Sequence, residues 1–193
     1  MPLPRFTRLP GDRRAEILRT AREMFAEHGP DTASYNKIIA AAGISKTAAY
    51  HYFDGREDLL SAVLDDLLAR LHGSLGPWRE AASPAEFWRG LRDGFARLHG
   101  HLAERPDDLA LVDVALARVP DHRFDAYLGA LIDNGRALGV IRADVDRELL
   151  LAATAAVFRV LDNWMLARPD APADALRQAW GLLAGLWSAT DAD

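Results

Sequence analysis

The sequence predicts an all-α protein with two domains. Through most of its 193 residues, apolar side chains recur every three or four positions, which is the spacing of one helix face. No segment shows the strict alternation of apolar and polar residues that a half-buried strand requires. Between residues 34 and 58, two short helical segments are separated by a glycine and followed by the start of a long helix. We therefore expect an N-terminal domain of residues 1–60 and a larger helical domain of residues 61–193.

The composition is that of a globular protein without disulfides. Half of the residues are hydrophobic and 26% are charged, and no long low-complexity tract appears. Because cysteine is absent, disulfides, thiolate nucleophiles and cysteine metal sites are excluded. The N-terminal residues lack the apolar core of a signal peptide, and the longest uncharged apolar run, residues 149–158, is too short to span a membrane. We predict a cytoplasmic protein that does not bind a membrane.

Positive charge is concentrated at the N-terminal end of the chain. The net charge is −5, yet residues 1–60 hold nine Lys or Arg against eight Asp or Glu, and the remainder holds fourteen against twenty. The only two lysines, Lys37 and Lys46, both lie between residues 34 and 58. This division fits a DNA-binding N-terminal domain, and the acidic remainder would discourage indiscriminate adhesion to DNA.

The first 28 residues divide into a proline-containing tail and a helix. Residues 1–11 contain three prolines and two arginines, which predicts a disordered tail; the alternative is an arm that touches DNA. Residues 12–28 form a helix that ends at Gly29 and Pro30. Its apolar face consists of Ile17, Leu18, Ala21, Met24 and Phe25. We expect this helix to brace the short helices that follow it.

Residues 34–52 have the pattern of a helix-turn-helix unit. Ser34 can cap a first helix over residues 36–42, because its hydroxyl can accept from a free backbone amide. Gly43 suits a left-handed turn, Ile44 is an apolar residue that such a turn buries, and Ser45 can cap the second helix. In such a unit the second helix lies in the DNA major groove with its first residues at the base edges. Here those residues are Lys46, Thr47, Ala48 and Ala49.

The residues that follow can hold the DNA backbone. Tyr50 and His51 carry groups that reach phosphate oxygens, whereas Phe53 is expected to turn into the core. Asp54 can cap the next helix, whose amide end and Arg56 would attract a further phosphate. The full set of predicted DNA-binding residues is Ser34, Tyr35, Lys37, Ser45, Lys46, Thr47, Ala48, Tyr50, His51 and Arg56.

Several spaced motifs of this region occur together. They read Ala42-Gly43-Ile44-Ser45-Lys46, Tyr50-His51-Tyr52-Phe53 and Arg56-Glu57-Asp58-Leu59-Leu60, and a helix over residues 17–29 precedes them. Together they resemble the DNA-binding domain of the TetR-type bacterial repressors. Three positions depart from that family: Ile39 replaces alanine, Thr47-Ala48-Ala49 replaces Gly-Thr-Leu or Gly-Thr-Ile, and Arg56 replaces lysine. The resemblance implies an N-terminal three-helix DNA-binding domain, a C-terminal helical domain for ligand binding and dimerisation, and a homodimer.

The larger domain is expected to contain six helices. They cover residues 56–71, 84–103, 107–118, 121–139, 146–166 and 173–189, and the first ends at the break over residues 72–77. The segment 146–166 is apolar almost all round, which predicts burial on more than one side. The family resemblance implies that the last two helices pair with their copies as a four-helix bundle. The candidate interface residues are Ala152, Ala156, Trp180, Gly181, Gly185 and Ser188.

Aromatic and polar residues of the larger domain are candidates for an effector pocket. Helices that carry bulky aromatic side chains and a few polar groups can enclose a mostly apolar ligand. The candidate lining residues are Phe87, Trp88, Leu91, Phe95, His99, Asp113, Asn134, Thr154, Asn163 and Trp164. Ordinary core packing explains the same pattern equally well, so both interpretations stay open.

The sequence offers no metal, cofactor or catalytic signature. His99 and His101 are two residues apart and point to different sides of a helix, and no carboxylate spacing completes a metal cage. A phosphate-binding glycine loop, a nucleophile elbow and a zinc-protease motif are all absent. We predict a regulator that represses from a palindromic DNA operator and is released by a small apolar or amphipathic effector. The alternatives are an activator, a regulator without a ligand, or a helical carrier or enzyme that has lost DNA binding.

Overall fold

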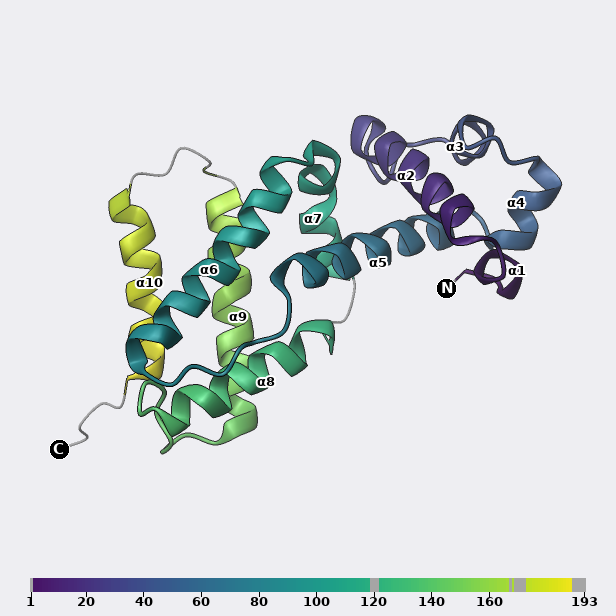
Figure 1. Cartoon of the computed structure of the whole chain (residues 1–193). Helices are drawn as coiled ribbons and strands as arrows, with labels where there is room; N and C mark the ends of the chain where they lie inside the picture. The colour runs from purple at the N-terminus through teal and green to yellow at the C-terminus, as the bar shows by residue number, and fades with distance from the viewer. Residues whose placement is uncertain (1, 119–121, 167, 169–172, 189–193) are drawn as a thin grey trace. The chain divides into compact units, whose positions relative to one another are not determined.

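The computed structural model describes residues 2–118, 122–166, 168 and 173–188. Within these residues the secondary structure is helical and contains no strand, which confirms the predicted all-α class (Figure 1). The helices are α1 (Pro4–Thr7), α2 (Gly11–His28), α3 (Tyr35–Ala41), α4 (Lys46–Tyr52), α5 (Arg56–Leu75), α6 (Pro84–Ala103), α7 (Pro106–Arg118), α8 (His122–Ala137), α9 (Arg147–Leu166) and α10 (Ala173–Trp187). Local sequence signals therefore located every larger helix to within a few residues.

The helices pack as two compact units. The first unit comprises Met1–Ser74 and Arg97–Pro120, and the second comprises Leu75–Ala96 and Asp121–Asp193. Helix α6 contributes to both units, because it begins in the second and ends in the first. This division follows packing and places most of α5 and all of α7 with the N-terminal helices. The division into functional domains at residue 60 is a different one and stays a prediction.

The first unit is packed around an apolar stripe on α5. Leu59, Leu60, Leu64 and Leu67 are each at most 1% exposed. The predicted end of this helix at residue 71 is wrong, because α5 continues to Leu75. A glycine inside a helix costs only about 1 kcal/mol relative to alanine, and burial of the helix's last leucine favours the longer form. The helix ends where Gly76 adopts a φ of 70°.

The predicted disordered tail is folded over its described residues. Pro4 occupies the first turn of α1, where a proline is favourable because that amide has no partner within the helix. Phe6 is only 4% exposed, and its ring centroid lies 4.7 Å from that of Phe53. The backbone amide of Leu3 donates to the carbonyl oxygen of Tyr52, at 2.8 Å. The proline and arginine content of residues 1–11 predicted disorder. That prediction is wrong for the described residues, because burial of the single aromatic residue Phe6 is enough to hold the segment in place.

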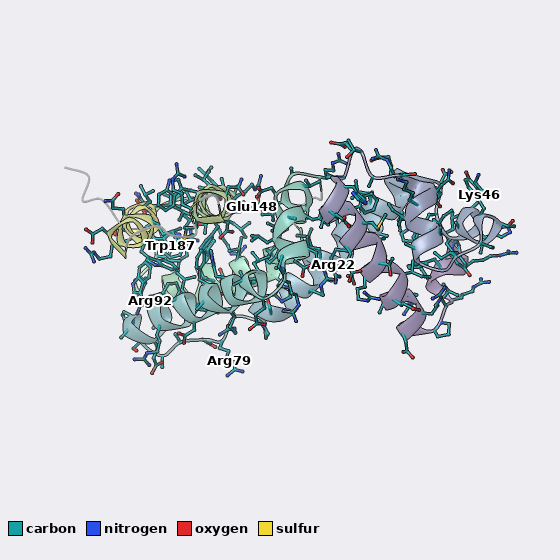
Figure 2. The ribbon with its side chains drawn as sticks, turned by 90° about the horizontal axis from the view of Figure 1, so that it is seen from above. Arg22, Lys46, Arg79, Arg92, Glu148 and Trp187 are labelled. Atoms are coloured by element: carbon teal, nitrogen blue, oxygen red, sulfur yellow. The ribbon has the colours of Figure 1, made fainter. Side chains whose placement is uncertain are left out.

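The second unit is packed around a cluster of aromatic residues. Trp187 is fully buried, and its indole nitrogen donates to the hydroxyl of Thr154 at 3.0 Å. Its ring lies near three others, with centroid distances of 5.6 Å to Trp88, 6.0 Å to Phe87 and 6.2 Å to Phe158. Figure 2 shows Trp187 on the side of α10 that is turned toward α6. We refer to Trp78, Phe87, Trp88, Phe158 and Trp187 as the aromatic cluster.

Helices α9 and α10 lie side by side, and each leaves an apolar face uncovered (Figure 1). In the single chain, Leu149, Val160 and Leu182 are 62%, 66% and 63% exposed. One side of α9 is thus uncovered in the single chain, and its burial on more than one side stays a prediction that requires a partner. Small or short residues are also exposed on these two helices: Ala152, Ala156, Gly181, Gly185 and Ser188. We refer to these eight residues as the α9–α10 face.

Candidate nucleic-acid interface

The turn between α3 and α4 has the predicted helix-turn-helix geometry. Gly43 adopts a φ of 63°, which only glycine accepts without strain, and Ile44 is buried after it. Ser45 has extended backbone angles, and its hydroxyl accepts from the amide of Ala48 at 3.2 Å. The predicted cap of α4 is thus present. Ser34 stands at the corresponding position of α3, but its side chain makes no capping hydrogen bond.

Arg13 of α2 braces this turn from outside. Its Nη2 group donates to the carbonyl oxygens of Ala42 and Gly43, at 3.0 Å each. Both carbonyls belong to the end of α3, where helix carbonyls lack intrahelical partners. Arg13 also pairs with Glu16, at 2.5 Å. No local pattern in the sequence indicates this role of Arg13, because 29 residues separate it from Ala42.

The first residues of α4 are exposed to solvent, which contact with DNA base edges requires. Lys46 and Thr47 are exposed, and Ala48 is half-buried. Figure 2 labels Lys46, the first residue of α4. Ala49 is fully buried, so the expectation that it contacts a base edge is wrong. Ala49 instead packs α4 onto the core. Lys46, Thr47 and Ala48 are the remaining candidates for contact with base edges.

Two tyrosines occupy the side of this unit toward the end of α4. Tyr50 is 57% exposed, and its ring centroid lies 6.1 Å from that of Tyr35. The Tyr35 hydroxyl is covered and has no hydrogen-bond partner in the described structure. Burial, followed by the neighbouring Tyr50 and Asp58, raises the pKa of Tyr35, so this phenol is a neutral donor. His51 is exposed beside Tyr50.

Arg56 is engaged inside the protein. Its Nη1 group donates to the carbonyl oxygen of Pro30 at 2.5 Å, and its Nη2 group pairs with Glu57. Arg118 of α7 reaches the same region and donates to Asp31 at 3.0 Å and to Glu57 at 3.3 Å. Both arginines therefore hold the loop between α2 and α3. A phosphate contact by Arg56 stays a prediction, and it would compete with these bonds.

The cations of residues 1–60 fall into two groups. Five arginines form hydrogen bonds within the protein, and four cations have no ion pair or hydrogen bond to any described residue. The engaged group is Arg13, Arg14, Arg19, Arg22 and Arg56. The free group is Arg5, Arg8, Lys37 and Lys46, and all four are exposed. Free cations are the ones that can replace counterions on DNA phosphates.

Most of the predicted effector-pocket residues of the second unit contact aromatic or backbone groups of the same unit. Phe87 and Leu91 are buried, and Trp88 and Phe95 are half-buried. The side-chain oxygen of Asn134 accepts from the Trp78 indole at 3.0 Å and from the Ala81 amide at 2.8 Å. Its amide nitrogen donates to the Ala81 carbonyl at 3.0 Å, so Asn134 fixes the segment before α6. The hydroxyl of Thr154 accepts a hydrogen bond from the indole nitrogen of Trp187.

The other predicted pocket residues are His99, Asp113, Asn163 and Trp164. His99 and Asp113 belong to the first unit, and Asp113 is exposed. Burial lowers the pKa of His99, which favours its neutral form. Asn163 is exposed on α9, and Trp164 lies under the guanidinium of Arg168, 5.0 Å from its ring centroid. Of the ten candidates, Phe87 and Trp88 belong to the aromatic cluster, Thr154 contacts it through Trp187, and Asn134 contacts it through Trp78.

Five of the six predicted dimer residues belong to the α9–α10 face. Ala152, Ala156, Gly181, Gly185 and Ser188 are exposed, whereas Trp180 is half-buried with its ring 5.3 Å from that of Phe95. A methyl group added at Gly181 or Gly185 would meet no atom within 4 Å in the single chain. Both glycines therefore leave room on the outer side of α10.

The described residues contain neither a membrane-spanning helix nor a metal-binding cluster. No helix among them is long and apolar enough to cross a lipid bilayer. The same residues contain no group of three or more His, Cys, Asp or Glu side chains that could hold a metal ion.

Comparisons with known proteins agree with this geometry. Residues 17–63 match the model of the family described as bacterial regulatory proteins, tetR family. The chain is 30% identical over 152 residues to the transcriptional repressor KstR2 of Mycolicibacterium smegmatis, and this alignment covers 73% of each protein. It is 39% identical over 62 residues to the repressor AcnR of Corynebacterium glutamicum, covering 32% of this chain and 33% of that one.

Solved structures share the fold over almost the whole chain. The fatty acid degradation regulator FadR of Bacillus halodurans has a TM-score of 0.68 at 21% identity and covers 92% of this chain and 97% of its own. SmeT, the repressor of a multidrug efflux pump of Stenotrophomonas maltophilia, has a TM-score of 0.64 at 19% identity, covering 93% and 88%. At these identities the likeness shows the fold alone, whereas the long match to KstR2 shows the family. The chain belongs to the TetR family of helix-turn-helix proteins and is a DNA-binding transcriptional repressor rather than an enzyme.

Proposed function

We propose that the protein is a homodimeric repressor that binds a palindromic operator and leaves it when a small apolar or amphipathic molecule binds. The observation that carries the proposal is the start of α4, where a capped helix presents Lys46 and Thr47 to solvent without a hydrogen-bond partner among the described residues. Nothing in the fold explains these two exposed side chains, and both can hydrogen-bond base edges. Because a repressor acts on chromosomal DNA, we propose that it works in the cytoplasm.

The DNA contacts divide into base readers and backbone holders. Lys46 and Thr47 can donate to base edges, and Ala48 can pack on a thymine methyl group. Tyr50, His51 and Lys37 are exposed around them and suit phosphate oxygens, which set position without reading sequence. A reader with so few polar side chains depends in part on DNA shape. Ser45 contributes through its cap, which fixes the first turn of α4.

The α9–α10 face supports the dimer. It carries three largely exposed aliphatic side chains on neighbouring helices, together with small residues that allow a close approach of a second backbone. A two-fold axis through this face would bring the same residues of two copies together, as an isologous interface requires. Two copies of α4 would then face two half-sites, which gives the operator its palindromic symmetry.

The aromatic cluster supports an effector that is mostly apolar. Trp88 and Phe95 of α6 are half-buried beside buried neighbours, so they offer apolar surface that a ligand could cover. A ligand that favours a conformation unable to bind the operator would weaken DNA affinity by about 5- to 150-fold.

The proposal is tested by selecting bound duplexes from a random-sequence library with the purified full chain. The salt concentration is held near the physiological value, because phosphate contacts make affinity salt-dependent. We expect enrichment of a palindrome whose half-sites are about one helical turn apart or slightly more. Enrichment of an asymmetric sequence would contradict the dimeric reader, and recovery of an unenriched library would contradict sequence-specific binding.

A charge placed on the α9–α10 face should abolish the dimer. We expect Leu182→Glu to yield a monomer by sedimentation and to lose about 100-fold or more in operator affinity, since two linked sites bind far more tightly than one. Leu109→Glu is the matched control, because Leu109 is an exposed leucine of α7 outside this face. A Leu182→Glu protein that remains dimeric would place the interface elsewhere.

A further inference from the structure

The N-terminal helix α1 is attached to the end of the reading helix α4. The amide of Leu3 donates to the carbonyl oxygen of Tyr52, which is the last residue of α4. The ring of Phe6 is buried between α1 and α4, with centroids 4.7 Å from Phe53 and 6.1 Å from Tyr52. Helix α2 adds a further tie, because Arg14 donates to the carbonyl oxygen of Thr7 at 2.6 Å. In Figure 1, α1 lies beside the end of α4.

Two cations of this segment have no role inside the fold. Arg5 and Arg8 are exposed, and neither forms an ion pair or hydrogen bond with a described residue. Phe6 takes the inward position on α1, which leaves the neighbouring Arg5 off the buried face. The first eleven residues contain no acidic side chain that could neutralise either arginine. The docked segment therefore holds two uncompensated positive charges at a fixed place.

The position of α1 at the end of α4 corresponds to the phosphate backbone that borders the major groove. Helix α4 has seven residues, so its two ends are about 10 Å apart at 1.5 Å per residue. The major groove is about 12 Å wide and is bordered by phosphates on both sides. When the start of α4 meets the base edges, cations fixed to its other end fall beside a phosphate backbone rather than beside bases. Arginine suits such a contact, because its guanidinium can donate two parallel hydrogen bonds to one phosphate.

We propose that α1 is a second DNA-binding element, in which Arg5 and Arg8 bind phosphates next to the groove that α4 reads. We call this element a clamp, because packing of Phe6 fixes the backbone that carries the two arginines before DNA arrives. Prior ordering reduces the conformational entropy that binding would otherwise cost. This inference rests on the proposed function, since it requires α4 to enter the major groove. The contacts carry no sequence information and contribute to affinity and to positioning.

The test compares the double variant Arg5→Gln/Arg8→Gln with the unchanged protein. Each phosphate contact contributes about 0.9 to the slope of log affinity against log salt concentration. With two arginines in each protomer of a dimer, the slope should decrease by about 3 to 4, and affinity at low salt should fall at least 10-fold. The measurement is a titration at several salt concentrations with both the selected operator and a duplex of unrelated sequence. The preference between these two duplexes should remain.

The matched control is Arg19→Gln/Arg79→Gln, which removes the same charge from exposed sites elsewhere. Arg19 pairs with Glu23 on α2, and Arg79 is exposed before α6. If only net charge matters, the slope of log affinity against log salt concentration will decrease equally in both double variants. That result would overturn the clamp. An unchanged slope in Arg5→Gln/Arg8→Gln would overturn it as well. If the unchanged protein binds both duplexes equally, the sequence-specific function fails, whereas the salt slope on the unrelated duplex still tests the clamp.

The rigidity of the clamp is tested separately at Phe6. Phe6→Ala keeps both arginines but removes the side chain that docks α1, so affinity should fall several-fold while the salt slope changes little. Phe6→Leu retains an apolar side chain and should restore most of the affinity. If Phe6→Ala binds both duplexes as tightly as the unchanged protein, docking of α1 makes no contribution and the segment is not a clamp.

Discussion

Replacing Asp108 by alanine is expected to lower the free energy of unfolding by about 3 to 5 kcal/mol, the loss typical of breaking a buried ion pair. The reason is that Asp108 is fully buried and its carboxylate is shared by three cationic or polar partners. Without it, two arginines would remain largely buried with part of their charge uncompensated. Equilibrium unfolding in urea, followed by circular dichroism at one fixed protein concentration, measures the change.

The partners of Asp108 come from three other helices of the first unit. Arg70 of α5 donates to it at 2.5 Å, Nε of Arg22 of α2 lies 3.2 Å from the same carboxylate, and His101 of α6 lies 2.9 Å away. Arg22 also donates to Asp107 at 2.9 Å. Burial alone would raise the pKa of Asp107, but the bond from Arg22 holds that pKa below its ordinary value of 3.8. Figure 2 labels Arg22, through which this ionic cluster reaches α2.

Asp113→Ala is the matched control for Asp108→Ala. It removes the same side chain from the same helix, but Asp113 is exposed. A surface substitution of this kind usually changes stability by about 0.5 kcal/mol or less. Equal losses in the two variants would mean that the ionic cluster adds nothing beyond an exposed charge. Arg22 connects α2, the helix that precedes the helix-turn-helix unit, to this ionic cluster. We therefore also expect Asp108→Ala to weaken operator binding.

Trp187→Ala should destabilise the second unit by about 3 to 5 kcal/mol, because a fully buried aromatic side chain is replaced by a cavity. The loss includes the ring contacts with Phe87, Trp88 and Phe158. It also leaves the buried hydroxyl of Thr154 without its donor. The measurement is again urea unfolding followed by circular dichroism, since the change removes a fluorophore.

Trp164→Ala serves as the control for Trp187→Ala. Trp164 is a half-buried tryptophan of α9 whose ring is covered in part by Arg168, so its removal should cost less than half as much. A loss at Trp164 as large as that at Trp187 would show that the aromatic cluster is not centred on Trp187. Such a result would also move the search for an effector site toward α9.

Signals within a few residues decided the local structure. Pro84 and Ala103 were predicted as the bounds of a helix and are the bounds of α6, because a proline at the first turn and a periodic apolar face are both local features. Gly43 and Ser45 were likewise predicted correctly, since a left-handed turn and a capping hydroxyl act on adjacent backbone groups. The motifs around them were specific enough to identify the family.

Signals that join distant residues were invisible in the sequence. Arg22 contacts Asp107 across 85 residues, and Trp78 contacts Asn134 across 56. Asn134 was predicted as a pocket residue. An isolated polar residue on an apolar helix has the same sequence pattern whether it contacts a ligand or bonds to groups within the protein, as Asn134 does. The docked α1 was missed for a related reason, because the favourable burial of Phe6 depends on Phe53, which lies on another element.

The sequence by itself determined the helices, the helix-turn-helix unit and the family, because caps, glycine turns and apolar periodicity act through neighbouring residues. Only the tertiary structure decided which cations are free to meet DNA. Arg13, Arg22 and Arg56 bond a carbonyl or carboxylate from elsewhere in the chain, whereas Arg5, Arg8, Lys37 and Lys46 are exposed and have no such partner among the described residues. That distinction depends on packing between distant segments, and a linear pattern of charges does not contain it.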